Sequence, residues 1–104
     1  MDPVVCIQSI IDAAKDEDWL DFAAGCENMY SWCRQCGHVP LPKVRELGEC
    51  LTQICKYYDW GEYFGRVCDL YDWIYRAESR QIVNVDLSME LAQIFLALAY
   101  CKRH

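Results

Sequence analysis

Three of the eight cysteines in this chain of 104 residues stand in patterns that could bind a metal ion. Cys33 and Cys36 form a Cys-x-x-Cys pair, and Cys101 and His104 form a Cys-x-x-His pair at the carboxyl end. Thiolates and imidazoles are the ligands of tetrahedral zinc, and short spacings of this kind are typical of zinc sites. These four residues define one alternative for the chain, a zinc-stabilised regulatory or nucleic-acid-associated protein.

A degenerate internal repeat allows each cysteine to be compared with its counterpart in the other copy. Residues 15–36 align with residues 56–77 at an offset of forty-one positions, and Trp32 then aligns with Trp73. Reduced cysteine behaves as a small, easily buried hydrophobe. Because five cysteines align with an apolar residue, we interpret them as core residues and predict that the protein has no metal or other cofactor. The five pairs are Cys6 with Leu47, Cys26 with Val67, Cys33 with Ile74, Cys36 with Ala77, and Cys55 with Ala14.

The sequence contains few residues that could be catalytic. Cys33 and His38 could form a nucleophile and base, but such a pair needs a third group that orients the base, and no third group can be identified. A redox Cys-x-x-Cys normally lies at a helix amino terminus, where the helix dipole stabilises a thiolate. Cys33 and Cys36 fall near a predicted carboxyl terminus, so we predict that the protein is not an enzyme.

Two tryptophans lie outside the apolar stripes of their predicted helices. At about 100° per residue, Trp73 shares its helix face with Arg66, Arg76 and Arg80, and Trp32 occupies the equivalent position in the first copy. Tryptophan and arginine contribute much of the energy of protein–protein binding. We therefore predict that these five residues bind a partner protein. The alternative, that each tryptophan packs inside the protein against the neighbouring hairpin, stays open.

The net charge of −6 is concentrated in the first third of the chain. Residues 1–30 carry seven acidic residues and one basic residue, whereas residues 31–104 carry equal numbers of the two. This distribution disfavours direct nucleic-acid binding, which depends on Lys and Arg. It suits a partner with a basic surface, but a solvated helix end is the simpler explanation of the two. RNA binding through the three arginines named above is a further alternative.

No export signal and no membrane-length apolar run are visible in the sequence. The start of the chain lacks the basic flank and cleavage site of a secretory signal, and the longest apolar run, Ile94 to Cys101, is far shorter than a membrane span. We therefore predict an intracellular protein in a reducing compartment, the cytoplasm or the nucleus, without contact with a membrane.

The periodicity of apolar residues predicts an all-α domain of about five helices within residues 1–104. Two related antiparallel hairpins are expected at about 3–36 and about 42–80, because short connections favour antiparallel neighbours. A carboxyl-terminal helix is expected at about 86–101, with Asp86 as its cap. This helix is apolar nearly all round, so it either lies centrally between the hairpins or buries a face against a second copy in a symmetric dimer.

Gly61-Glu62-Tyr63, with Tyr57 before it, resembles the turn between the paired helices of tetratricopeptide repeats. The resemblance covers about twenty residues of each copy, and the first copy has Leu20 where the second has the glycine. It implies that paired helices stack and present a binding surface. We expect a non-catalytic protein-interaction module, an adaptor or a small inhibitor of a partner. Its size and acidity fit a virus- or phage-encoded accessory factor.

Overall fold

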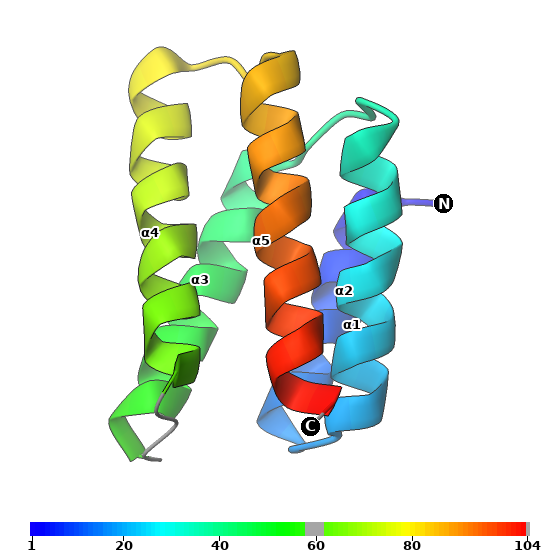
Figure 1. The fold of residues 1–104 in the computed structure, drawn as a ribbon, viewed down its shortest axis with the longest axis vertical. Coiled ribbons are helices and arrows are strands. Elements are labelled where there is room, and N and C mark those ends of the chain that lie inside the picture. The colour runs from blue at the N-terminus through cyan, green and yellow to red at the C-terminus, as the bar shows by residue number, and fades with distance from the viewer. Residues whose placement is uncertain (58–61, 104) are drawn as a thin grey trace.

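The two predicted hairpins each fold as a pair of antiparallel helices, and a fifth helix follows them (Figure 1). The computed structural model describes residues 1–57 and 62–103, and these residues form helices and no strand. The prediction of an all-α fold with five helices is confirmed. The helices are α1 (Pro3–Lys15), α2 (Trp19–Arg34), α3 (Leu41–Tyr57), α4 (Glu62–Arg80) and α5 (Val85–Arg103).

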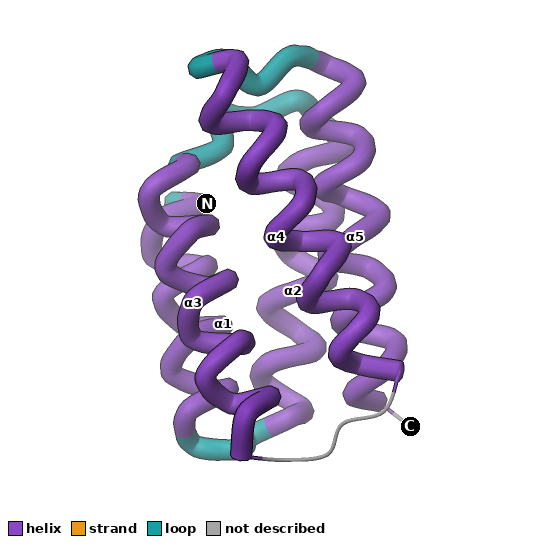
Figure 2. Tube along the Cα trace, turned by 90° about the vertical axis from the view of Figure 1, so that its left-hand side faces the viewer, coloured by secondary structure: helices purple, strands orange, loops and turns teal. Residues whose placement is uncertain are grey.

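The five helices form two layers, which both views of the chain show (Figures 1 and 2). One layer contains α4, α5 and α2 in that order, and the other contains α3 and α1. Each helix packs against two others, so that the contacts close a ring in the order α1, α2, α5, α4, α3. The carboxyl-terminal helix therefore separates the second helices of the two hairpins, while their first helices touch directly.

Asp or Asn side chains cap the amino termini of three helices. The carboxylate of Asp2 accepts a hydrogen bond from the backbone N–H of Val4 at 2.9 Å and thereby caps α1. Asp18 caps α2 in the same way. The amide oxygen of Asn84 accepts from the backbone N–H of Leu87 at 2.9 Å. Such bonds satisfy N–H groups that have no partner within the helix, so α5 begins two residues earlier than the predicted cap, Asp86, would place it.

Three residues other than glycine take a left-handed backbone conformation just after a helix. Glu17, Cys36 and Gln81 have φ angles of 57°, 56° and 59°. At the end of α2, the N–H of Gly37 donates to the carbonyl of Trp32 at 3.2 Å, which is the long bond of a Schellman motif. Glycine is the residue best suited to a left-handed conformation. At the ends of these three helices a residue other than glycine takes that conformation.

The repeated apolar stripes form the core of the bundle. Within each hairpin, apolar side chains of both helices are buried. Residues at equivalent positions of the two copies belong to the same core cluster. The equivalent buried pairs are Ile10 and Leu51, Phe22 and Tyr63, Cys26 and Val67, Met29 and Leu70, and Cys33 and Ile74. The structure therefore supports the interpretation of residues 15–36 and 56–77 as one repeated unit, within the part of the chain that is described.

The apolar composition of α5 follows from its position between α2 and α4. Leu91, Phe95 and Leu98 are fully buried, and so is the small residue Ala92. The hydroxyl of Ser88 donates to the carbonyl of Cys33 at 2.7 Å in the buried contact between α5 and α2. Of the two positions expected for this helix, the structure shows the central one. A second copy of the chain is not needed to explain its composition.

None of the described helices combines the length and the apolar character that a membrane-crossing segment requires.

Candidate functional site

Trp73 lies entirely inside the protein. Its side chain is fully buried, and its indole N–H donates to the carbonyl of Leu87, in the first turn of α5, at 2.8 Å. Its face of α4 is covered by α5, so the tryptophan has no surface to offer a partner in this conformation. Trp73 is therefore buried, as the packing alternative required, but the element that covers it is α5 and not the neighbouring hairpin.

Trp32 has the same kind of contact in the first copy. Its indole N–H donates to the carbonyl of His38 at 2.8 Å, and a Cβ atom on Gly37 would lie only 2.4 Å from the indole ring. The ring therefore packs against the backbone of the segment that follows its helix, as Trp73 does. Trp32 remains half-buried, so part of its surface is still accessible.

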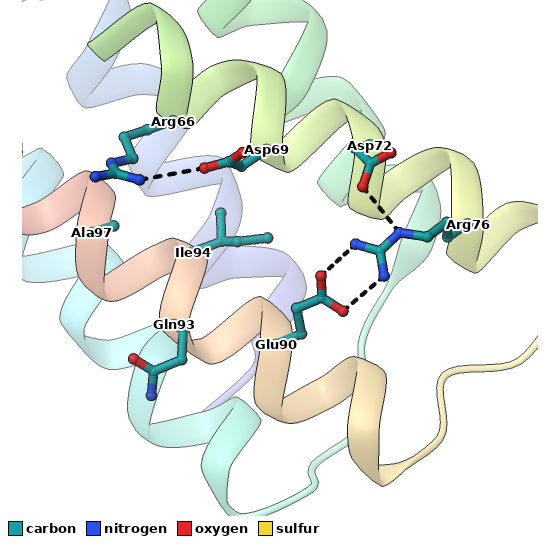
Figure 3. Close-up of a pocket in the computed structure, with 8 residues that line it drawn as sticks. All are labelled: Arg66, Asp69, Asp72, Arg76, Glu90, Gln93, Ile94 and Ala97. Atoms are coloured by element: carbon teal, nitrogen blue, oxygen red, sulfur yellow. Dashed lines mark hydrogen bonds and ion pairs between the residues drawn. The ribbon is translucent and has the colours of Figure 1, made fainter. Parts of the chain in front are cut away.

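Arg76 is tied to two carboxylates. Its guanidinium donates to both oxygens of Glu90 on α5, with an Nη1–Oε2 distance of 2.9 Å, and also to Asp72 at 3.0 Å (Figure 3). These bonds lower the pKa of the Glu90 carboxyl below its ordinary value, so the pair is ionised at neutral pH. The predicted partner residue Arg76 thus joins α4 to α5.

Arg66 and Arg80 are less constrained than Arg76. The Arg66 side chain is half exposed, and its Nη1 lies 3.4 Å from a carboxylate oxygen of Asp69. This separation lies beyond the usual range of a strong charged hydrogen bond. Arg80 is exposed near the end of α4, and its charge contributes to the lowered pKa of Glu90. Both arginines lie at the surface.

A groove lies between α4 and α5. Two of these arginines, Arg66 and Arg76, line it together with side chains of α5. Figure 3 shows α4 side chains on one wall and α5 side chains on the other. A second stretch continues the groove toward the carboxyl end of α5, where Tyr100 is 66% exposed. We call the whole the α4–α5 groove. It is lined by Arg66, Asp69, Asp72, Arg76, Glu90, Gln93, Ile94, Leu96, Ala97, Tyr100 and Cys101.

The α5 wall of this groove was not predicted from the sequence. Glu90, Gln93, Ala97 and Tyr100 are spaced by three, four and three residues, which places them on one side of a helix. This spacing was visible in the sequence, but a helix taken to be apolar all round offered no reason to look for an outer face. The exposure of Gln93 and Tyr100 shows that α5 has such a face.

The cysteines divide into three groups by exposure, and none of the eight forms a disulfide bond. Cys26 and Cys33 are fully buried, which supports their interpretation as core residues. Burial raises the pKa of the Cys33 thiol to about 12. Cys6 and Cys55 are half-buried. The interpretation is wrong for Cys36, because its left-handed position after α2 directs the side chain outward, where it is exposed.

The zinc alternative requires residues from opposite ends of the bundle. The carbonyl of Cys33 accepts a hydrogen bond from Ser88 in the first turn of α5, whereas Cys101 lies thirteen residues farther along the same helix. At 1.5 Å per residue this separation is about 20 Å, far beyond the span of one metal site. Cys33 and Cys101 therefore cannot bind the same ion. His104, the fourth residue of that set, lies outside the described residues.

No three His, Cys, Asp or Glu side chains among the described residues gather closely enough to hold a metal ion. The suggested Cys33–His38 nucleophile pair is also unsuited to its task. A thiol with a pKa of about 12 is protonated at neutral pH, and the fully buried Cys33 cannot meet a substrate.

No protein-family model matches this chain, and neither a curated protein nor a solved structure matches it.

Proposed function

We propose that this domain is a non-catalytic interaction module, an adaptor or an inhibitor, that binds another protein through the α4–α5 groove. One observation carries the proposal: Arg66 from α4 and Tyr100 from α5 line the same groove, and both are at least half exposed. Arginine and tyrosine are among the residues that most often dominate binding energy at protein interfaces.

The floor of the groove suits a protein partner. Leu96 and Ala97 line the groove together with the two polar side chains and are only partly covered. Interfaces commonly place an apolar centre inside a polar rim, and aromatic and arginine side chains are enriched there. The long contact between Arg66 and Asp69 leaves the guanidinium able to turn toward a partner carboxylate. Arg76, which is held by Glu90, keeps the two walls of the groove in place.

The test compares two groove variants with a matched control. The wild-type chain, immobilised as the bait, is used to capture partners from a cell extract, and each captured protein is then purified and its Kd measured. Arg66→Ala and Tyr100→Ala are expected to weaken binding by about thirtyfold, the effect of losing about 2 kcal/mol at a dominant contact. Tyr75→Ala is the control, because Tyr75 is 74% exposed on α4 and does not line the groove.

Stability must stay constant for this comparison to be informative. Exposed side chains usually change the free energy of unfolding by less than about 0.5 kcal/mol when they are replaced, so all three variants are expected to melt like the wild type. Equal binding by the wild type and both groove variants would contradict the proposal. A loss of binding that is as large for Tyr75→Ala would place the contact elsewhere.

A further inference from the structure

A second groove lies between α1 and α2, on a different pair of helices from the α4–α5 groove. Its volume is about 400 Å³, near the low end of the range for sites that hold a ligand. We call it the α1–α2 groove. It is lined by Met1, Asp2, Val5, Cys6, Ser9, Asp21, Ala24, Gly25 and Asn28.

Close packing of the two helices shapes this groove. A Cβ atom on Gly25 would lie 2.5 Å from Cγ1 of Ile10, so α1 and α2 can approach this closely only with glycine at that position. The thiol of Cys6 donates to the carbonyl of Gly25 at 3.6 Å, within the longer limit for sulfur donors. Val5 and Ala24 are both exposed beside this contact. Val5, Cys6, Ala24 and Gly25 are the part of the lining without a charged or amide side chain, which we call the apolar floor of the groove. Its shape is set by contacts within the hairpin.

The charged side chains that line the groove are both carboxylates. Asp2 and Asp21 are exposed, and no Lys or Arg side chain is among the lining residues. Lys15, the only basic residue within positions 1–30, is not one of them. The groove thus combines an apolar floor with two carboxylates and the α-amino group of Met1, in the part of the chain whose side chains carry the whole net charge of −6.

The two carboxylates lie toward opposite ends of the groove. Along α2, Asp21 precedes Asn28 by seven residues, a rise of about 10 Å. The helices α1 and α2 are antiparallel (Figure 1). The start of α1, with Asp2, therefore lies toward the carboxyl-terminal half of α2, which contains Asn28. A helical peptide rises by the same distance between positions i and i+7.

We infer that the α1–α2 groove binds a basic segment of a partner protein, whose apolar side chain enters the groove between Lys or Arg residues that face Asp2 and Asp21. Complementary charge selects a basic partner and speeds the encounter, and the apolar floor contributes affinity. This surface is separate from the α4–α5 groove, so the chain would contact two proteins, or two parts of one protein, through different faces.

The experiment uses the intact chain and a fluorescein-labelled helical peptide that carries Leu at its centre and Arg at positions i and i+7. Fluorescence anisotropy is expected to show saturable binding that weakens as the salt concentration rises. The double variant Asp2→Asn with Asp21→Asn is expected to weaken binding by about tenfold. Asparagine at position 2 preserves the cap of α1. Ala24→Leu fills the groove from an exposed position and is expected to abolish binding.

Two control variants separate this inference from the proposed function. Asp86→Asn removes one negative charge at the start of α5, outside both grooves, and Arg66→Ala alters only the α4–α5 groove. Both are expected to bind the peptide like the wild type.

Three results would overturn the inference: no saturable binding up to about 1 mM peptide, unchanged binding by Ala24→Leu, or equal binding of a peptide with Glu in place of Arg.

Discussion

The two aligned tryptophans show how one residue type can keep its structural role in both copies of a repeat. Each indole N–H donates at 2.8 Å to a backbone carbonyl beyond the end of its own helix, His38 for Trp32 and Leu87 for Trp73. A buried tryptophan usually needs such a partner for its N–H group. Helical periodicity correctly placed both residues off the stripe that faces the first helix of the hairpin. Periodicity alone could not show that a further segment covers them.

The burial of Trp73 predicts a large effect on stability. Trp73→Ala should lower the free energy of unfolding by about 3–5 kcal/mol, because it leaves a cavity in the core. Trp73→Phe should cost less, about 1–3 kcal/mol, because it keeps most of the packing but leaves the carbonyl of Leu87 without its indole partner. Urea unfolding followed by circular dichroism measures both changes. An unchanged midpoint for Trp73→Ala would contradict the buried position.

The exposure of the thiols predicts an order of reactivity. Cys36 and Cys68 are exposed and should react first with a thiol reagent, whereas Cys26 and Cys33 are buried with raised pKa values and should react only on unfolding. Peptide mapping after brief labelling checks this order. Fast modification of Cys33 in the folded protein would contradict it.

The raised pKa of Cys33 also predicts the direction of a pH effect. An unfolded thiol loses its proton near pH 8.5, whereas Cys33 in the folded protein keeps its proton up to a pKa of about 12. Between these values the unfolded state binds fewer protons, so stability should fall as the pH rises. Cys33→Ala should reduce this alkaline loss, which urea unfolding at pH 7 and pH 10 would measure.

At the level of the helices, periodicity and the repeat predicted the number and order of the elements, but they predicted the helix ends less well. Asn84 and Asp86 are both good capping residues two positions apart, and the sequence does not decide between them. The end of α2 was expected near Cys36, but Cys36 is the left-handed residue after that end. Glycine normally marks this position, and its absence after three helices removed the usual signal.

The left-handed residues predict a gain in stability when they are replaced by glycine. Gln81→Gly should raise the free energy of unfolding by about 1 kcal/mol, because it relieves the steric cost of a side chain at positive φ. Ser79→Gly, two residues earlier inside α4, should instead lower it by about 0.5 kcal/mol. Thermal unfolding of the two variants compares these effects. A lower melting temperature for Gln81→Gly would show that its side chain stabilises the turn by other contacts.

On the scale of the whole molecule, the position of α5 decides both the core and the candidate site. The composition of α5 was compatible with a central position between the hairpins and with a contact to a second copy. The central position depends on contacts with α2 and α4, which the pattern of residues within α5 does not reveal. The same contact creates the α4–α5 groove. For this reason the sequence predicted Arg66 and Arg76 on α4 but missed Tyr100 on α5, whose role depends on the helix beside it.

The closed ring of contacts predicts that both hairpins unfold together when α5 is weakened. Phe95 is fully buried on α5, so Phe95→Ala should cost about 3–5 kcal/mol and should remain compatible with a single transition. Hydrogen exchange of backbone amides should then speed up in α1–α4 as well as in α5, because the slowest amides exchange only through global opening. Gln93→Ala is the control, since Gln93 is exposed on the same helix. If one hairpin kept its protection while the other lost it, the hairpins would be independent units and α5 would belong to only one of them.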